Sequence, residues 1–496
     1  MKLKYVFIFL LGVLKIVAQS STISSSNLQI PSLSSLQINA IVSPQKGMMV
    51  FDNELKTLRT FDGTKWGSGN AQDSNFESQN MALFRGNINN HDNVFDMKTD
   101  ANGNVYVLTT YRGTVTYGSQ TFTNTHPLLY FVALVKFNAD GQILWANDLG
   151  NNTSYGPLSV DNFGNVYVGG HKFLANGNRD IANDSPFSMP TFAPNGNFYG
   201  YKRIEGYSQT INNITFGCPN GTNPPNNNGI FAYDSNKNLL WVKHACAGDI
   251  YIDGTFADAA NNCYFTGYFY NGSFDFSNGT APTAVLTTVN RKHFVGKIAA
   301  NGTFQWIKSF QNIRANSIDD AITHVSLHRI DAEGNLILLV GFNANDLYYN
   351  ENIIVGTNTC VSPQNYIAFG NGIELKINPS NGSLVASQQG FANSGYYSEQ
   401  QTMLTNDNVY NIKALPCPLI NEVCPPILPQ AIILKRNKAN EVIWTTKTKA
   451  TLNAIAAGTQ KSVWIAGSFT TGNLTFGSTT LTTSQPSSMF LLRIKE

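Results

Sequence analysis

From about residue 95 onward, the chain repeats one pattern of polar and hydrophobic positions. A short turn rich in Asn and Gly is followed by an alternating run of β-branched and aromatic residues. Asn and Gly tolerate the positive φ of tight hairpin turns, so each copy predicts a β-hairpin. Seven copies begin at Asn102, Phe163, Asn195, Asn261, Glu333, Asn406 and Gln460.

A second repeated pattern predicts two further strands. An apolar strand carries a basic residue, a turn follows, and the next strand carries a Trp four positions after the turn residue. The copies are Lys136 through Gly141 to Trp145, Lys297 through Gly302 to Trp306, and Lys435 through Asn440 to Trp444. Two copies depart from the pattern. Lys237 to Trp241 has Ala232 at the basic position, and Lys376 through Gly382 has Ala386 where Trp is expected.

A third element lies between these two patterns, in the segments Thr116-Tyr117-Gly118, Thr215-Phe216-Gly217, Asp275-Phe276-Ser277 and Thr475-Phe476-Gly477. Each unit therefore contains about four strands over roughly 50–70 residues. Four-stranded antiparallel sheets of this size are the blades of a β-propeller. The predicted fold is an all-β propeller, with aromatic residues at the repeat positions forming the core between blades.

The two ends of the repeat region predict that the propeller ring closes. The last unit stops at Phe490–Ile494, one strand short, while Met81–Arg85 is an apolar segment placed where a Trp strand would lie. Pairing these segments would close the ring and remove two exposed sheet edges. We expect seven blades. Six is the alternative, because Gly164 and Gly196 are only 32 residues apart and the two turns could share one enlarged blade.

The N-terminus predicts export. Lys2 and Lys4 precede an apolar run from Tyr5 to Val17, and Val17-Ala18-Gln19 is a suitable cleavage site, as in a secretory signal peptide. We therefore expect a signal peptide at 1–19, a linker and small β module at 20–75, and the propeller at 78–496. The mature protein would be secreted, periplasmic or at the cell surface. We expect no membrane span after signal cleavage, since no second stretch is long and apolar enough.

Six cysteines in an exported chain suggest disulfides. The short spacing of Cys417 and Cys424 favours a local bridge. Two of Cys218, Cys246 and Cys263 could also pair, because they lie close in the sequence. Connectivity that includes Cys360 stays open.

Composition narrows the function further. Only 13% of the residues are charged and the formal net charge is +2, so the chain lacks the basic surface of a nucleic-acid-binding protein. We find no motif for catalysis, cofactor binding or a metal. His324 and His328 are four residues apart but lack the Glu of a zinc-protease motif.

The repeat resembles the bacterial SBBP-type β-propeller repeats, in which a G-N-x-Y turn strand precedes K-x-x-x-x-G-x-x-x-W. The resemblance covers about 80% of the chain and implies an architecture, not an activity. Residues 28–70, with Gly47-Met48-Met49-Val50-Phe51-Asp52 and Phe61-Asp62-Gly63-Thr64-Lys65-Trp66, resemble a short module of Bacteroidetes surface and fibre-like proteins. Together with the Val-Ala-Gln cleavage site, this resemblance implies an origin in that phylum.

The leading functional hypothesis is a non-enzymatic binding or scaffold propeller whose partner is an extracellular or periplasmic protein or glycan. Its site would lie on long irregular loops, because loops carry function on rigid sheets. The candidate loops are Phe173 to Thr191, Cys218 to Asn228, Asn358 to Asn371 and Pro416 to Pro429, with Tyr396 and Tyr397 as possible ligand-contact aromatics. Alternatives are a carbohydrate-active hydrolase or lyase, and a structural subunit of a surface fibre or adhesin.

Overall fold

The computed structural model describes most of the repeat region and parts of the N-terminal region. The described residues are 30–34, 37–38, 41–53, 57–61, 63, 66–68, 77–84, 93–151, 157–204, 209–216, 228–244, 249–270, 272–275, 285–288, 291–313, 322–331, 333–342, 346–349, 352–355, 369–389, 393–394, 400–403, 408–414, 431–437, 442–459, 461–470, 472–476, 479–484 and 488–495. Contacts divide the chain into two compact units, Met1–Asn75 and Phe76–Glu496.

The first unit contains one small sheet. Its strands, in spatial order, are β1 (Ser32–Leu33), β2 (Met49–Asp52), β3 (Thr57–Phe61) and β4 (Trp66–Ser68). β1 pairs parallel to β2, and the other pairs are antiparallel. The carboxylate of Asp52 is buried and is held by Arg59, with Nη1 3.4 Å from Oδ2.

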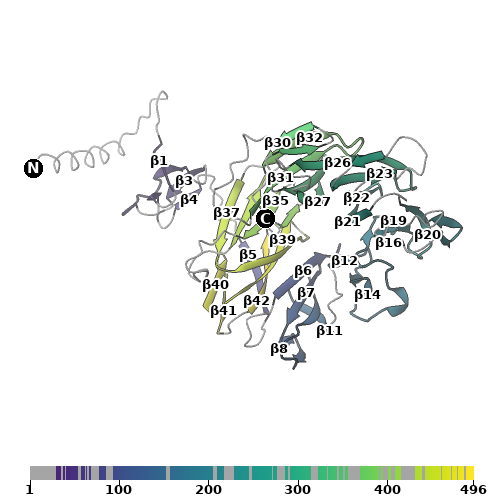
Figure 1. Cartoon of the computed structure of the whole chain (residues 1–496). Helices are drawn as coiled ribbons and strands as arrows, with labels where there is room; N and C mark the ends of the chain where they lie inside the picture. The colour runs from purple at the N-terminus through teal and green to yellow at the C-terminus, as the bar shows by residue number, and fades with distance from the viewer. Residues whose placement is uncertain are drawn as a thin grey trace, which may run out of the picture. The chain divides into compact units, whose positions relative to one another are not determined.

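The second unit is all-β and propeller-like, a succession of antiparallel sheets (Figure 1). Each sheet is named here by its first strand.

The β6 sheet contains β6 (Asn93–Thr99), β7 (Val105–Tyr111), β10 (Phe131–Phe137) and β11 (Ile143–Gly150). The β12 sheet contains β12 (Leu158–Val160), β13 (Val166–Val168) and β14 (His171–Phe173). The β15 sheet contains β15 (Thr191–Phe192), β16 (Phe198–Arg203), β19 (Asn228–Tyr233) and β20 (Leu239–Lys243). The β21 sheet contains β21 (Asp249–Ala257), β22 (Cys263–Tyr270), β25 (Lys292–Ile298) and β26 (Phe304–Ile313), extended by β29 (Asp346–Tyr349) and β30 (Asn352–Val355).

The β27 sheet contains β27 (Ile322–Ile330), β28 (Leu336–Phe342), β31 (Phe369–Ile377) and β32 (Leu384–Gln389), and β33 (Asn393–Ser394) also pairs with β31. The β34 sheet contains β34 (Gln400–Met403), β35 (Val409–Ala414), β36 (Ala431–Arg436) and β37 (Val442–Thr448). The β38 sheet contains β38 (Thr451–Ala457), β39 (Ser462–Phe469), β42 (Ser488–Lys495) and β5 (Glu77–Phe84).

The strand pairing predicted between the two ends of the repeat region is present. β5 pairs antiparallel with β42, with Leu83 opposite Phe490 and Met81 opposite Leu492. The turns at Gly164 and Gly196 lie in different sheets, the β12 and β15 sheets.

The sequence patterns left open how the third sequence element pairs. It forms separate two-stranded hairpins between the second and third strands of a sheet, outside the four-stranded sheet. These hairpins are β8 (Gly113–Tyr117) with β9 (Gln120–Asn124), β17 (Gln209–Ile211) with β18 (Ile214–Phe216), β23 (Gly272–Asp275) with β24 (Val285–Thr288), and β40 (Gly472–Phe476) with β41 (Thr479–Thr483). An alternating run predicts a strand but does not specify the sheet that it joins.

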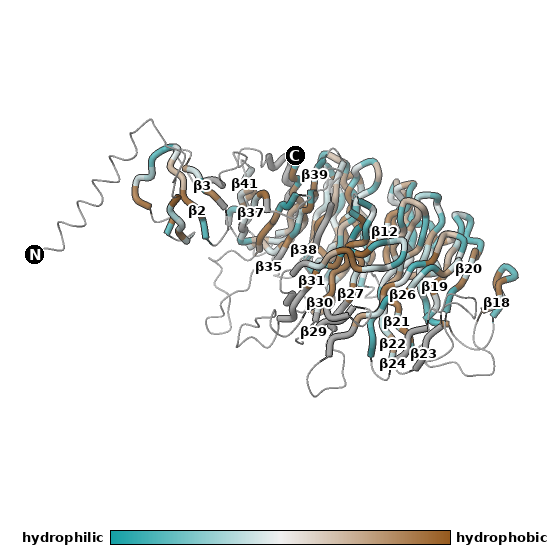
Figure 2. The backbone as a smooth tube through the Cα atoms, turned by 90° about the horizontal axis from the view of Figure 1, so that it is seen from above, coloured by the Kyte–Doolittle hydropathy of each residue, from teal (hydrophilic) through white to brown (hydrophobic). Residues whose placement is uncertain are grey.

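Four of the described polar turns between first and second strands, 100–104, 161–165, 258–262 and 331–335, are stabilised by the side chain of their first residue, an Asp. In the turn 100–104, Oδ1 of Asp100 accepts hydrogen bonds from the backbone N–H of Asn102 and Asn104, at 3.0 and 2.9 Å. Asn104 Nδ2 donates to the other carboxylate oxygen at 2.8 Å. Asx side chains favour such turns because they satisfy backbone donors locally. The strands between turns are hydrophobic and the turns hydrophilic (Figure 2).

Adjacent sheets are joined by a repeated contact that we call the clasp. In the β6 sheet, Lys136 lies opposite both Tyr106 and Trp145 on its neighbouring strands. Lys136 Nζ and Trp145 Nε1 both donate to the carbonyl oxygen of Ala175, at 2.8 and 3.0 Å. Ala175 belongs to the turn that follows β14, so the clasp connects the β6 sheet to the β12 sheet.

The clasp recurs further along the chain. Lys297 Nζ and Trp306 Nε1 both donate to Pro379 O at 3.0 Å, joining the β21 and β27 sheets. Trp241 Nε1 donates to Ala300 O at 3.0 Å, joining the β15 and β21 sheets. At these repeat positions the two Lys and the three Trp side chains therefore make contacts between sheets, as the sequence predicted for the aromatic residues.

The clasp also explains the glycine in each turn that faces an indole of the preceding sheet, at Gly177, Gly302 and Gly382. A Cβ on Gly302 would lie 2.7 Å from the ring of Trp241, and one on Gly382 would lie 2.7 Å from that of Trp306. The indole of one sheet therefore rests on the bare backbone of the next sheet's turn.

The glycine requirement can be tested with two matched substitutions. Gly302 and Gly334 have the same φ of +84°, but a Cβ on Gly334 would have no neighbour within 4 Å. Gly334→Ala should lower the free energy of unfolding by about 1 kcal/mol, because Ala disfavours a positive φ. Gly302→Ala should cost about 1–3 kcal/mol more, because the new methyl overlaps the indole. Urea unfolding followed by Trp fluorescence measures both, and equal losses would contradict the clasp.

Candidate functional site

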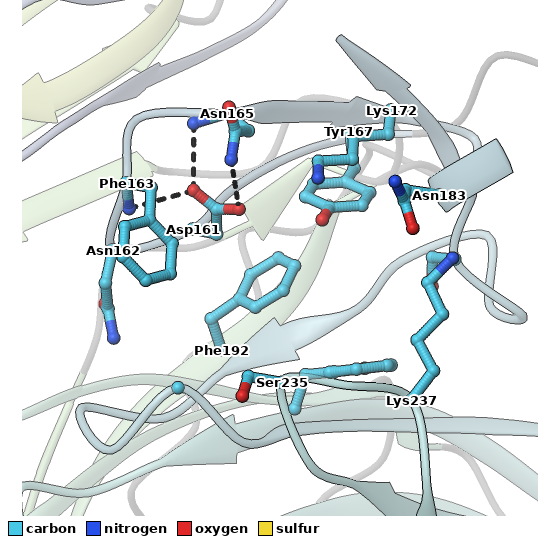
Figure 3. Close-up of a pocket in the computed structure, with 13 residues that line it drawn as sticks. Asp161, Asn162, Phe163, Asn165, Tyr167, Lys172, Asn183, Phe192, Ser235 and Lys237 are labelled. Carbon is cyan, nitrogen blue, oxygen red and sulfur yellow. Dashed lines mark hydrogen bonds between the residues drawn. The ribbon is translucent and has the colours of Figure 1, made fainter. Parts of the chain in front are cut away.

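A pocket of about 110 Å³ is lined by residues of the β12 and β15 sheets (Figure 3). On one side are the turn residues 161–163 and 165, Tyr167 of β13 and Lys172 of β14. The long segment after β14 contributes Asn183 and Ser185. On the other side are Phe192, Phe198 and the turn residues Ser235 and Lys237.

The pocket lies at a clasp position that has no Trp. Lys172 lies opposite Tyr167 and five residues before Gly177, as Lys136 lies five residues before Gly141. Ile181 therefore occupies the Trp position of this unit. This copy was not recognisable from the sequence because it lacks the Trp, although its Lys-to-Gly spacing is the same.

The chain leaves the sheet where the Trp strand would begin. One bridge, between Phe173 and Arg179, continues the hairpin, and the 3-10 helix η2 (Ile181–Asn183) follows. Ile181 is 74% exposed, so its side chain does not fill the clasp position.

The turn 234–238 of the β15 sheet, on the other side of the pocket, also differs from the turns of the other clasps. Ser235 occupies the position of the carbonyl-bearing residues Ala175, Ala300 and Pro379, and Lys237 occupies the glycine position with a φ of 65°. A side chain at this position would overlap the indole in the three described clasps that contain a Trp, so Lys237 and a Trp exclude each other here.

In the other clasps, a sheet donates hydrogen bonds to the turn of the sheet that follows it. Here Lys237, in the turn of the following sheet, is the donor. Its Nζ donates to the carbonyl oxygens of Asp184 at 2.9 Å and Ala182 at 3.4 Å, across the pocket from its own sheet. The side chain extends toward Asn183 (Figure 3). Burial lowers the pKa of Lys237, and the nearby Lys172 ammonium lowers it further.

Ion pairs fix the segment that forms the pocket's rim. Arg179 makes a two-pronged contact with Asp184, at 2.5 Å (Nη1–Oδ1) and 2.6 Å (Nη2–Oδ2). Lys172 Nζ lies 3.1 Å from Asp180 Oδ2. Burial raises the pKa of Asp184, but hydrogen bonds from Arg179 and the Lys172 backbone outweigh it and bring that pKa to about 2.

The pocket also has an aromatic wall. The rings of Tyr167 and Phe192 lie 4.9 Å apart between centroids. Phe163, in the turn 161–165, is 76% exposed beside the opening. Burial raises the pKa of Tyr167, and Asp161 raises it further, so the phenol is protonated at neutral pH and can donate.

This arrangement suits binding better than acid–base chemistry. Both oxygens of Asp161 accept hydrogen bonds within its own turn, from Phe163 N and from the backbone and side chain of Asn165. Asp161 therefore shapes the turn, and Asp180 and Asp184 are engaged in ion pairs. The ammonium groups, amides and hydroxyls of the lining offer donors to a polar ligand.

Most residues singled out from the sequence lie outside the described part of the chain. These are Tyr396, Tyr397, Cys218, Cys246, Cys360, Cys417 and Cys424. Of the candidate loops, Phe173 to Thr191 is described and contributes Asn183 and Ser185 to the pocket. His324 and His328 lie on β27, where register shifts between Ile322 and His324 and between Leu327 and Arg329 interrupt regular pairing.

One disulfide candidate is corrected. Cys263 is a free cysteine and is fully buried in β22, where it packs within the core. Its position in the repeat is a strand position facing the core, and a thiol fits there as a small hydrophobic side chain.

Within the described residues, no helix is both long enough and apolar enough to cross a membrane.

Comparisons with known proteins add little. No protein-family model matches the sequence, and no curated protein matches it. Among solved structures, a protein of unknown function from Dyadobacter fermentans matches with a TM-score of 0.35 and 8% identity, covering 84% of this chain and 99% of that one. The quinohemoprotein alcohol dehydrogenase of Comamonas testosteroni matches with a TM-score of 0.40 and 10% identity, over 86% and 78% of the two chains. Virginiamycin B lyase from Staphylococcus aureus matches with a TM-score of 0.38 and 11% identity, over 83% and 99%. At scores this low, these likenesses carry no argument.

The ion pair at the pocket rim predicts a pH-dependent stability. The pKa of Asp184 is lower in the folded protein than its ordinary value of 3.8, so its ionised form stabilises the fold above about pH 4. This contribution disappears as the pH falls from about 4 to 2. The side chain is 30% exposed, so we expect only about 1–2 kcal/mol after screening. Denaturant unfolding at pH 5 and pH 2.5 should show a smaller difference for Asp184→Asn than for the wild type. An equal change in stability between the two pH values for both proteins would contradict the stabilising role of ionised Asp184.

Proposed function

We propose that the protein is a non-enzymatic binding propeller, exported from the cytoplasm, that captures a glycan in the pocket between the β12 and β15 sheets. The observation that supports this proposal most directly is the clasp position that has no Trp. Three described clasps fill this place with an indole, whereas here a long loop and Lys237 leave a polar pocket with an aromatic edge.

A glycan is the favoured ligand because of the pocket's mixed chemistry. Sugar hydroxyls both donate and accept hydrogen bonds, and the lining offers ammonium, amide and hydroxyl groups from Lys172, Lys237, Asn183 and Ser235. The hydrophobic face of a sugar ring packs on aromatic side chains, and Phe163 presents its ring beside the opening.

The scaffold proposed for this site is a seven-bladed ring. The first strands β6, β12, β15, β21, β27, β34 and β38 contact one another in that order, and β38 also contacts β6. Arg493 of β42 donates to Ala139 O at 2.7 Å, a clasp from the last sheet to the first. The pairing of β5 with β42 supports the same closure.

Export, the SBBP-type repeat and a Bacteroidetes origin belong to the same proposal. They rest on the signal-peptide pattern of residues 1–19, the K-x-x-x-x-G-x-x-x-W spacing and the N-terminal module. An exported chain would place its cysteines in an oxidising environment.

Binding is tested with the mature chain, residues 20–496, on an array of neutral and uronate-containing polysaccharides, followed by titration calorimetry of the strongest binder. Phe163→Ala should weaken binding at least tenfold. Phe95→Ala is the matched control, because Phe95 is 55% exposed on β6 and is not part of the pocket lining. Equal binding by both variants would contradict the proposal, as would an array without any binder.

The same samples separate the alternatives. Shortened glycan products on chromatography would favour the hydrolase or lyase. Stable oligomers in light scattering, without glycan binding, would favour a fibre or adhesin subunit.

Cysteine mapping tests export. In the secreted chain, cleavage at Glu422 without reduction should release peptides still joined by a Cys417–Cys424 disulfide. Cys263 should react with an alkylating reagent only after unfolding, because it is fully buried and burial raises the pKa of its thiol. Unlinked Cys417 and Cys424 in the secreted protein would count against the bridge. Reaction of Cys263 in the native state would contradict the core assignment.

A further inference from the structure

The first strand of the β21 sheet contains a β-bulge that displaces an acidic side chain. The pairing of β21 with β22 shifts register between Ile252 and Gly254, so Asp253 has no cross-strand partner. A bulge redirects the side chain of its extra residue and is frequent beside binding sites. Asp253 is exposed, and Tyr201 of the preceding sheet donates its hydroxyl to the Asp253 carbonyl at 3.1 Å.

A group of stacked side chains surrounds this bulge. The rings of Tyr251 and Tyr268 stack at 4.7 Å with an angle of 15°. Tyr270 stands edge-on to both, at 6.2 and 5.8 Å. The Arg291 guanidinium lies 4.2 Å from the centre of the Tyr268 ring. Tyr270 keeps 37% of its surface exposed, so the group has an open aromatic edge.

Two polar atoms of this group are buried without a hydrogen-bond partner among the described residues. They are Oδ1 of Asp249, which lies opposite Tyr270 in the sheet, and Nε of Arg291. Buried polar atoms are nearly always paired in folded proteins, by protein, water or ligand. One acceptor and one donor therefore remain for a hydroxyl-bearing molecule or for water.

We propose that Tyr251, Tyr268, Tyr270, Asp253 and Arg291 form a second site, which binds the ring of a neutral pyranose sugar. The aromatic edge of Tyr270 would pack on the C–H face of the sugar. The Asp253 carboxylate would accept hydrogen bonds from its hydroxyls, and the Arg291 guanidinium would donate to a ring or hydroxyl oxygen.

This site is separate from the pocket between the β12 and β15 sheets. The pocket is built at the ends of strands that carry the polar turns 161–165 and 234–238. In the β21 sheet, the corresponding turn, 258–262, precedes β22, whereas Tyr268 and Tyr270 lie at the other end of that strand. The inference rests on the proposed function only for the class of ligand.

Asp253 gives this site a pH response. Asp253 keeps an exposed surface, but the side chains packed around it remove part of its hydration and raise its pKa to about 6, although Arg291 lowers it. The charged carboxylate is therefore lost just below neutral pH. Asp253 acts on Tyr268, and the other titratable or charged groups beside Tyr251 and Tyr268 are Tyr270, Asp249, Arg203 and His293.

Titration calorimetry of the mature chain with neutral oligosaccharides of glucose, mannose, galactose and xylose tests the site. One of these should bind the wild type, and Tyr270→Ala should weaken it at least tenfold, while Tyr270→Phe should change it less than threefold. Tyr130→Ala is the matched control, because Tyr130 is 39% exposed and lies outside the group. Wild-type affinity should fall severalfold between pH 7 and pH 5, and Asp253→Asn should bind more weakly without this pH dependence.

The outcomes distinguish the two sites. Binding lost in Tyr270→Ala and kept in Phe163→Ala supports the second site alone. Binding lost in Phe163→Ala and kept in both Tyr270→Ala and Asp253→Asn overturns the second site and leaves the pocket standing. Absence of binding to all four sugar classes also overturns it, while the polysaccharide array still tests the pocket. Asp253→Asn changes few atoms and should fold. If Tyr270→Ala does not fold, the pH dependence of binding by Asp253→Asn therefore tests the second site.

Discussion

The clasp is the interaction on which the arrangement of sheets depends. Within a sheet, backbone hydrogen bonds hold the strands, but neighbouring sheets meet mainly through side chains. The clasp gives this contact a direction, because Lys136 and Trp145 donate to one oxygen, the carbonyl of Ala175. The buried Lys136 ammonium also lies 4.8 Å from the Tyr106 ring centre and 4.0 Å from Asp100. Burial lowers the pKa of Lys136 and Asp100 opposes this, so the clasp specifies geometry at an energetic cost that its partners offset.

Features of the fold that depend on local patterns, including the spacing of the clasp residues, were predictable from the sequence. The alternating strands, the Asx-Gly turns and the Lys–Gly–Trp spacing are local patterns, and they predicted strands and hairpins that the structure contains. The pairing of β5 with β42 was predictable because an incomplete unit at one end matched an unassigned strand at the other. The pairing of the third element was not predicted, because β8–β9 and its counterparts look like any other strands in the sequence. Local periodicity determines strand formation, and tertiary contacts determine the strand partner.

The pocket was not predictable for a related reason. It depends on the segment 181–184 after β14 and on Lys237 of the next sheet, which come into contact only after folding. Lys237 was visible in the sequence as the turn residue before Trp241, yet its departure from Gly carried no meaning until the clasp was known. A left-handed Lys costs about 1 kcal/mol relative to Gly. Its hydrogen bonds to Ala182 and Asp184 offset this cost, and local backbone strain of this kind is frequent at functional positions.

Positions that are the same in every repeat and positions that differ between repeats therefore have different roles in this fold. The first strands β6, β21 and β38 each contain a bulge at the same place, and the displaced residues are Phe95, Asp253 and Asn453. The backbone geometry recurs while the side chain changes from aromatic to acidic to amide. Since the clasps already fix the sheets, these positions are free to differ without loss of the scaffold. Binding chemistry should thus be sought where the repeat is broken, as at Lys237, or where it leaves the side chain unconstrained, as at Asp253.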